Sequence, residues 1–203
     1  MRALALLVLL LSGSACSAYT GGARDMAPDT LRRERGWLAV HGVPVLHQQA
    51  EHDCGPTALA MVVGYHRPDL TDSPLLDADR THRTSARELR DRARKLGMRA
   101  FVVEGAPEDL LNELKQGRPA IVGMAKPTIQ GAVSHYEVVI GIHKDSRRIA
   151  TLDPAEGWRQ NSLVDFMTEW ESTGRVLLVV IPAAATTQPV APSAQAALND
   201  AAD

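Results

Sequence analysis

Several residue types that would identify a class of protein are scarce in this sequence. Its 203 residues include only two cysteines, Cys16 and Cys54, and 4% aromatic residues. Two cysteines can form neither the disulfide framework of a small exported domain nor a cysteine-rich zinc site. Lys and Arg total 22 against 24 for Asp and Glu, so no positive excess suggests a nucleic-acid surface. Function must therefore be sought in local motifs.

Motifs for metals, nucleotides and membrane spans are also missing. The chain has seven histidines, but none lies in a ligand pair such as H-E-x-x-H. No apolar run beyond the first residues approaches membrane length, and no G-x-x-x-x-G-K-[ST] loop is present. We therefore expect no metal and no cofactor, and any exporter that works with this polypeptide would be a separate protein.

The first 16 residues have the pattern of an export signal. Arg2 supplies a positive charge, residues 3–11 form an apolar run too short to span a bilayer, and small residues follow up to Cys16. The last five of these residues resemble a bacterial lipoprotein lipobox, although Gly13 stands where such boxes usually carry Leu. The resemblance implies lipidation of Cys16 and attachment to a membrane in the cell envelope. The alternative is ordinary cleavage near Ala15 or Ala18, which would leave a soluble secreted protein.

Composition divides the rest of the chain into three parts. Residues 17–36 mix Gly, Ala, Arg, Asp and Pro without periodicity and are predicted to be a flexible tether. Residues 183–203 contain almost no large apolar side chain and are predicted to be a disordered tail. The chain is 45% hydrophobic, so residues 37–182 can bury one core as a single domain.

Within the domain, helical patterns come first and strand patterns follow. Helices are expected from Cys54, from the capping box Ser85–Glu88 to Gly97, and over residues 107–116 and 163–171. Aliphatic and β-branched runs predict strands over residues 99–103, 119–124, 136–143, 148–152 and 176–181. Residues 144–147 are expected to form a hairpin turn. The predicted fold class is α+β, with the helices packed on an antiparallel sheet.

Cys54 is the strongest candidate for a reactive group. It stands in Asp53-Cys54-Gly55-Pro56, where a loop becomes an apolar helix. Unpaired backbone N–H groups and the helix dipole favour a thiolate at such a position. The alternative is a buried small hydrophobic residue, which is what most free cysteines are.

Two later residues are expected to meet at one end of the sheet. His135 is predicted at the start of the strand 136–143, and Asp153 at the end of the next strand. Antiparallel pairing would bring the two side chains together. A helix N-terminus laid against that end would then place Cys54 beside His135, giving a nucleophile, a base and an orienting carboxylate.

With these residues in order, the chain resembles the bacteriocin-processing, double-glycine-leader peptidases, a family of papain-like cysteine peptidases. The likeness rests on Gln48 six residues before Cys54, on Asp53-Cys54-Gly55, on His135 before an aliphatic strand, and on Asp153-Pro154. It extends over roughly residues 43–181. Many relatives are domains of ATP-driven exporters, whereas this sequence carries no transporter motifs.

The resemblance implies a role for each matched residue. Cys54 would be the nucleophile, His135 the general base and acid, Asp153 the orienting carboxylate, and Gln48 an oxyanion donor with the Cys54 backbone N–H. Gln49 is the alternative in register. The expected activity is cleavage of a peptide or isopeptide bond in a peptide or protein substrate within the bacterial cell envelope.

Two other functions fit the same motifs. A non-catalytic envelope factor could keep the fold and use its cleft to hold an extended peptide. An acyltransferase could use the same three groups to pass an acyl group to an amine instead of water. Special acidity of Cys54 would separate an enzyme from a binder, and product analysis with added amines would separate transfer from hydrolysis.

Overall fold

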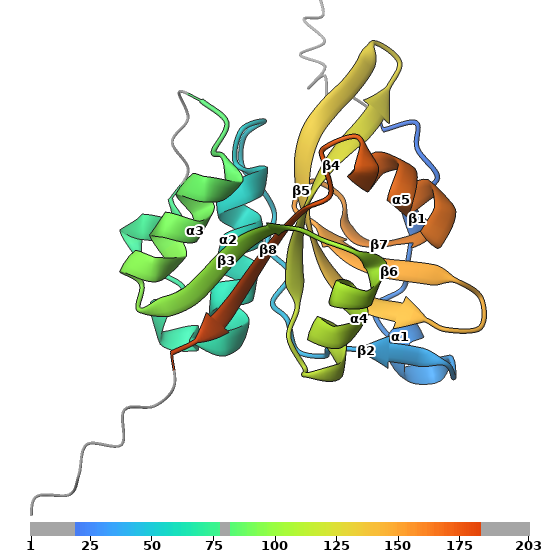
Figure 1. The fold of residues 1–203 in the computed structure, drawn as a ribbon, viewed down its shortest axis with the longest axis horizontal. Coiled ribbons are helices and arrows are strands. Elements are labelled where there is room, and N and C mark those ends of the chain that lie inside the picture. Colours follow the sequence, from blue (N-terminus) through green and yellow to red (C-terminus); the bar gives the residue numbers. More distant parts are fainter. Residues whose placement is uncertain (1–18, 78–81, 184–203) are drawn as a thin grey trace, which may run out of the picture.

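An eight-stranded antiparallel sheet forms the centre of the structure, a computed structural model that describes residues 19–77 and 82–183 (Figure 1). Helices pack on this sheet, so the predicted α+β class is confirmed. The predicted signal segment 1–16 with Cys16 lies outside the described residues, as does the predicted tail except for its first residue. Within the described ranges, no helix combines the length and the hydropathy needed to cross a membrane.

The strand order brings distant parts of the chain side by side. Seven strands follow one another as β1, β7, β6, β5, β4, β8 and β3, and β2 pairs with β5. The bounds are Arg24–Asp25 for β1, Trp37–Ala39 for β2, Met98–Glu104 for β3, Ala120–Thr128 for β4, Gly131–His143 for β5, Arg148–Asp153 for β6, Gly157–Ser162 for β7 and Val176–Pro182 for β8.

The helices pack against different parts of the sheet. In Figure 1, α2 and α3 lie on the left with the paired strands β3 and β8, and α5 lies on the right near β7. The capping box at Ser85 and Glu88 forms as predicted, and Ser162 caps α5; each hydroxyl accepts a helix N–H. The bounds are Thr30–Arg33 for α1, Cys54–His66 for α2, Ala86–Lys95 for α3, Pro107–Lys115 for α4 and Leu163–Glu171 for α5.

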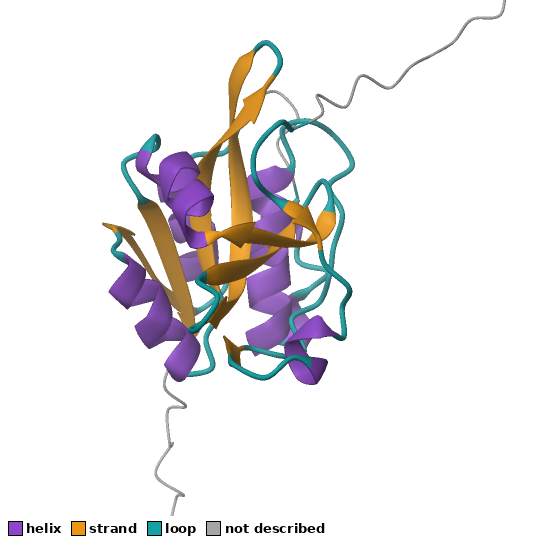
Figure 2. Cartoon of the chain, turned by 90° about the vertical axis from the view of Figure 1, so that its right-hand side faces the viewer, coloured by secondary structure: helices purple, strands orange, loops and turns teal. Residues whose placement is uncertain are grey.

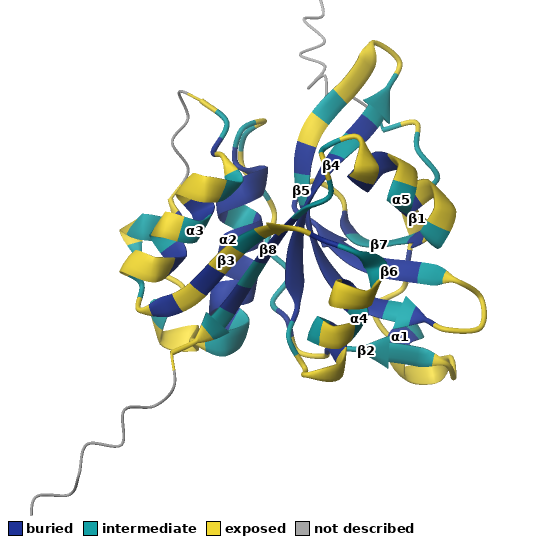
Figure 3. Ribbon diagram, viewed as in Figure 1, coloured by how far each residue is buried: buried dark blue, intermediate teal, exposed yellow. Residues whose placement is uncertain are grey.

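Helix α2 is apolar around its whole circumference. Leu59, Met61 and Val62 are fully buried, as is most of the helix between Cys54 and Gly64 (Figure 3). A helix that is hydrophobic on all sides must be enclosed by the rest of the domain. The core therefore fixes the position of the residue that begins α2, which is Cys54.

The β4–β5 hairpin is longer than the sequence predicts. Its strands pair continuously from Ala120 opposite Val139 to Thr128 opposite Gly131, and the hairpin extends beyond the body of the domain (Figure 2). His135 therefore lies inside β5, opposite Met124, and not at the first residue of the strand. The extension was missed because residues 125–134 are largely polar or small and include Pro127, and cross-strand pairing holds them extended.

A β-bulge separates the two halves of β5. Against β6 the pairing runs from Val139 opposite Thr151 directly to Gly141 opposite Ala150, so Ile140 is the additional residue. The Ile140 carbonyl accepts a hydrogen bond from the Val40 backbone N–H at 2.8 Å. The half of β5 beyond the bulge pairs with β2, and the half before it carries His135.

The segment predicted to be a flexible tether packs on the domain over residues 19–36. It contains β1, which pairs with β7, and helix α1. Met26 and Leu31 are each only 5% exposed and join the core. The prediction failed here because two apolar anchors within a polar stretch give no periodic signal. Strand β7, whose sequence is also largely polar, was missed for the same reason.

Candidate active site

Cys54 is the first residue of α2 and the only cysteine among residues 19–77 and 82–183; it is buried and makes no disulfide. The preceding residue, Asp53, is the N-cap, but its side chain makes no capping hydrogen bond. Pro56 fits the first turn because helix N–H groups there have no intrahelical acceptor. The thiol thus lies at the positive end of a rigid helix.

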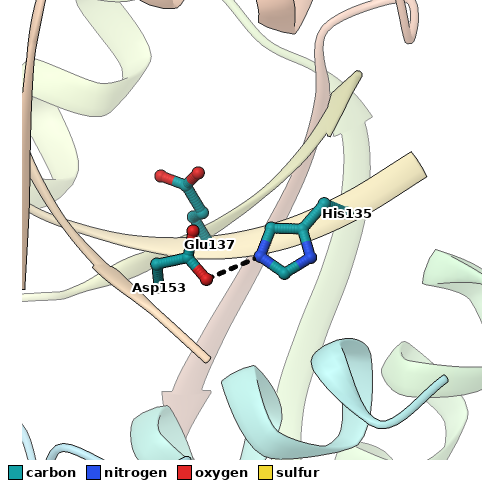
Figure 4. Close-up of side chains that lie close together, drawn as sticks. All are labelled: His135, Glu137 and Asp153. Atoms are coloured by element: carbon teal, nitrogen blue, oxygen red, sulfur yellow. Dashed lines mark hydrogen bonds and ion pairs between the residues drawn. The ribbon is translucent and has the colours of Figure 1, made fainter. Parts of the chain in front are cut away.

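His135 and Asp153 come from neighbouring antiparallel strands and meet as the sequence predicts. His135 Nε2 lies 2.8 Å from Asp153 Oδ1 (Figure 4). Their exposed fractions are 2% and 0%. Asp153 Oδ1 also accepts the Ala155 backbone N–H at 2.7 Å. The carboxylate is therefore fixed by the turn that follows β6, and it fixes the imidazole ring in turn.

Cys54 and His135 interact, and each group changes the other's acidity. Burial alone would raise the pKa of Cys54, but the interaction with His135, together with the Tyr136 backbone, brings that pKa below its usual value. Burial would lower the pKa of His135, but the hydrogen bond to Asp153 and the interaction with Cys54 raise it to about 10. Both shifts favour a thiolate beside an imidazolium.

Asp153 is the charged partner that makes this pair possible. Its burial would raise the carboxyl pKa, but the hydrogen bond and charge of His135 outweigh burial and lower it. Asp153 is therefore ionised at neutral pH, and it stabilises the imidazolium. The structure thus brings three of the predicted site residues together: Asp153 bonds to His135, and His135 interacts with Cys54.

The two glutamines before Cys54 have different surroundings. The Gln48 backbone N–H donates to the Pro154 carbonyl at 2.9 Å, which ties this loop to the residue after Asp153. Its side-chain Nε2 donates to the Ala50 carbonyl at 3.1 Å, and its buried Oε1 has no hydrogen-bond partner. Gln49 is exposed, and its amide donates to the His47 carbonyl.

A buried cluster of three charged side chains lies near the His135 imidazole, and it was not predicted from the sequence. Lys126 Nζ lies 2.6 Å from Glu137 Oε1 and 3.0 Å from Glu169 Oε2, and all three side chains are almost fully buried. Glu137 carries the one available signal, because it is two residues from His135 and so shares its face of β5. No pattern in the sequence connects Lys126 with Glu169 of α5.

His135, Glu137 and Asp153 are close enough to form a metal-binding set, and no other such group occurs in the described part of the chain. Their potential ligand atoms all lie within 4.8 Å of one another. However, His135 and Asp153 already bond to each other, and Lys126 neutralises Glu137. A cation here would have to displace a buried ammonium group, so these side chains fit a proton relay better than a metal centre.

A cavity of about 320 Å³ opens beside the thiol. Its wall comes from the loop before α2, the residues leading into α3, and the strands β5 and β8. Arg83 donates to the Ser134 carbonyl at 3.1 Å and helps to close one side. This cavity gives a reactant a path to Cys54, and it is lined by residues that include Cys54, Arg83, Thr84, Tyr136 and Val176.

Comparison with protein families and solved structures identifies the same region. The model of the Peptidase C39 family matches residues 42–184. A double glycine motif protease from an AMS/PCAT transporter, solved in complex with the leader peptide, aligns with a TM-score of 0.55 at 22% identity, covering 71% of this chain and 95% of that one. A search of curated proteins gave no match.

Two further solved structures are similar. A C39-like peptidase from Bacillus anthracis has a TM-score of 0.56 at 18% identity, covering 71% of this chain and 98% of that one. The peptidase domain of Streptococcus ComA, a bifunctional ABC transporter in a quorum-sensing pathway, has a TM-score of 0.53 at 22% identity, covering 70% and 100%. These likenesses confirm the predicted papain-like fold.

Proposed function

The chain belongs to the Peptidase C39 family, and we propose that it is a cysteine peptidase that cleaves a peptide or isopeptide bond through Cys54, His135 and Asp153. The observation that carries the proposal is the buried His135–Asp153 pair, bonded at 2.8 Å, which interacts with Cys54 at the start of α2. A binding protein has no need of a buried thiol with a lowered pKa beside an imidazole whose pKa is raised. This arrangement therefore favours an enzyme over the non-catalytic alternative.

Each group has a defined task in this mechanism. The Cys54 thiolate attacks the carbonyl carbon of the scissile bond, and the carbonyl π electrons move to oxygen to form an oxyanion. The His135 imidazolium donates its proton to the departing amine, which leaves an acyl-enzyme. Neutral His135 then removes a proton from water as the water attacks, and the thiolate is released with the product acid.

We propose Gln48 over Gln49 as the side-chain oxyanion donor. Gln48 is held beside Pro154 and only one of its amide N–H groups is engaged, so the second remains for the oxyanion. The backbone N–H of Cys54 would be the other donor. Gln49 is exposed and bonds back to its own loop, which supports a role in the loop rather than in catalysis.

The proposed substrate is an extended peptide or protein segment in the bacterial cell envelope. One solved relative was crystallised with a leader peptide, which supports a peptide ligand for this fold. The predicted export signal supports an envelope location and an anchor at a lipidated Cys16. Incorporation of a radiolabelled fatty acid into the full chain, and its loss in Cys16→Ser, would test that anchor.

The catalytic proposal is tested with an activated peptide ester or thioester and the full chain. We expect a burst of product followed by turnover, with an acyl adduct on Cys54 detected by mass spectrometry. Cys54→Ala should abolish both signals while the circular dichroism spectrum stays unchanged. Adducts that persist at other residues in Cys54→Ala would contradict the proposal. Addition of a primary amine tests the acyltransferase alternative by diverting the acyl group.

A further inference from the structure

The N-terminal segment of residues 19–26, termed here the N-terminal strap, lies outside the 42–184 family match but is bound to the domain at both ends. At one end, β1 pairs with β7, and the Met26 backbone N–H donates to the Trp158 carbonyl at 3.1 Å. Arg159 of β7 binds both the Asp25 carboxylate and the Ala23 carbonyl. The strap is thus anchored beside the active-site end of the sheet.

The other end of the strap adds to an open edge of β4. Strand β8 pairs with β4 only at Ile121 and Val122, so the outer part of β4 has a free edge. Thr20 N–H donates to the Pro127 carbonyl at 2.8 Å, and Tyr19 forms an antiparallel bridge with Thr128. Extended peptides bind sheet edges in this way, through main-chain hydrogen bonds.

Tyr19 then reaches the proposed catalytic base. Its hydroxyl lies 3.3 Å from His135 Nδ1, and the two ring centroids are 5.4 Å apart. Lys126 Nζ lies 5.5 Å from the centroid of the Tyr19 ring. Burial raises the pKa of Tyr19, so its phenol is neutral, and its oxygen can accept a hydrogen bond from the Nδ1–H of the His135 imidazolium.

The Tyr19 hydroxyl contacts Nδ1, the imidazole nitrogen that takes part in the proposed reaction. Asp153 engages His135 Nε2, so Nδ1 is the nitrogen that exchanges a proton with the thiol and the leaving amine. The cavity beside Cys54 includes neither Tyr19 nor His135 in its lining. The thiol is therefore reachable from the cavity, while Tyr19 occupies the approach of a leaving group to the imidazole.

We propose that the N-terminal strap is an internal competitor of the substrate: Tyr19 covers His135 and residues 19–20 occupy the β4 edge that an extended substrate strand would use. This inference rests on the proposed peptidase function. Only molecules whose strap has left the β4 edge would be active. The apparent substrate affinity would equal the intrinsic affinity multiplied by the fraction of such molecules. An extended peptide that pairs with residues 124–128 of β4 is the expected displacing ligand.

Two glycines let the strap lie flat against the domain. A Cβ on Gly21 would collide with the carboxylate of Glu169, which Lys126 holds in place. A Cβ on Gly22 would collide with Asp165 and Asn161. Gly21→Val should therefore dislodge the strap without altering Cys54, His135 or Asp153.

The experiment compares Tyr19→Ala, Tyr19→Phe and Gly21→Val with the remote control Tyr65→Phe in the full chain. Two rates are measured: alkylation of Cys54 by iodoacetamide, resolved by mass spectrometry, and turnover of an activated peptide substrate. If the strap is closed nine-tenths of the time, Tyr19→Ala and Gly21→Val should raise turnover about tenfold. Alkylation should stay close to the wild-type rate, because iodoacetamide reaches the thiol from a cavity that Tyr19 does not line. Tyr19→Phe should give a smaller rise in turnover, because the ring still covers His135, and Tyr65→Phe should give none.

Unchanged or lower turnover in Tyr19→Ala and Gly21→Val would overturn the strap proposal, because Tyr19 would then support the site and not cover it. Hydrogen exchange tests the strap independently of activity: the Thr20 and Met26 amides should exchange faster in Gly21→Val, and equal exchange with equal turnover would overturn the proposal. Faster exchange in Gly21→Val, with no turnover of any peptide substrate by any variant, would uphold the displacement of the strap and count against the peptidase function alone.

Discussion

The two sides of the candidate active site differ in how their polar side chains are held. On the sheet side, His135, Asp153 and Lys126 are buried and bonded to fixed partners, although Asp153 Oδ2 has no hydrogen-bond partner. On the loop side, the Gln48 and Gln49 amides bond only to carbonyls of their own loop, and Gln48 Oε1, His52 Nδ1 and Asp53 Oδ1 are buried without partners. The comparison teaches that the His135–Asp153 pair is preformed, while the loop that leads to Cys54 keeps hydrogen-bonding capacity that a bound substrate can use.

The largest effect on activity is expected from substitution of Asp153 on the sheet side. Asp153→Asn preserves the shape but removes the charge that stabilises the imidazolium, so kcat/KM should fall by about 10³- to 10⁴-fold. Because Asp153 raises the pKa of His135, the variant should also lose imidazolium at lower pH. The pH profile of Cys54 alkylation checks this.

In the wild type, the rapid alkylation that depends on the ion pair should persist from above the lowered Cys54 pKa up to about pH 10, where His135 loses its proton. In Asp153→Asn, the alkaline limit should move toward neutral pH. An unchanged alkaline limit in Asp153→Asn would show that Asp153 does not control the imidazole.

A large loss of stability is expected from Lys126→Met. The substitution leaves Glu137 and Glu169 as two buried carboxylates without their cation, which should lower the free energy of unfolding by about 3–5 kcal/mol. Urea titration of the full chain measures the change. The control variant adds Glu137→Gln and Glu169→Gln and should recover most of the loss, since no uncompensated charge remains. Equal stability of Lys126→Met and the wild type would contradict a tightly paired sheet side.

Gln48→Ala tests the loop side directly. Removing one oxyanion donor should lower kcat by about 10²-fold, or roughly 3 kcal/mol of transition-state stabilisation, with little effect on folding. Gln49→Ala is the matched control and should stay within about threefold of the wild type, because an exposed side chain away from the reacting atoms adds little. Steady-state kinetics with one peptide substrate measure both. A larger loss in Gln49→Ala would reverse the assignment.

The smallest effects are expected at two helix caps. Ser85 accepts the Glu88 N–H at the start of α3, so Ser85→Ala should cost about 1 kcal/mol of stability. Asp53 makes no side-chain cap bond at α2, so Asp53→Asn should change stability by less than about 0.5 kcal/mol. Thermal unfolding of both variants checks the contrast, and a larger cost at Asp53 would show that the loop side is more tightly held than its contacts indicate.

The sequence predicts the part of the site that depends on local pattern. The apolar run after Cys54 indicates a buried helix with the thiol at its start, and the aliphatic strands near His135 and Asp153 indicate an antiparallel pair. These signals are local and periodic, so they can be read without knowing the fold. The convergence of the three side chains follows from the pairing of β5 with β6.

The remaining part depends on contacts between segments far apart in the chain. Lys126 meets Glu169 only because α5 packs against β4, and Tyr19 meets His135 only because the strap crosses to the β4 edge. The strap itself resembles a linker in composition, since it is rich in glycine and polar residues. Its order comes from β7 and from the burial of Met26, which propensity does not reveal.

The bulge at Ile140 separates the part of β5 that carries His135 from the part that pairs with β2. Before Ile140, the strand keeps a fixed alignment with Leu152, next to Asp153; after it, the strand has its own alignment with β2 and with the turn of residues 144–147. An insertion or deletion in that turn can therefore be accommodated on the distal side without rotating the imidazole. The domain can change length at this hairpin during evolution and still keep His135 and Asp153 aligned.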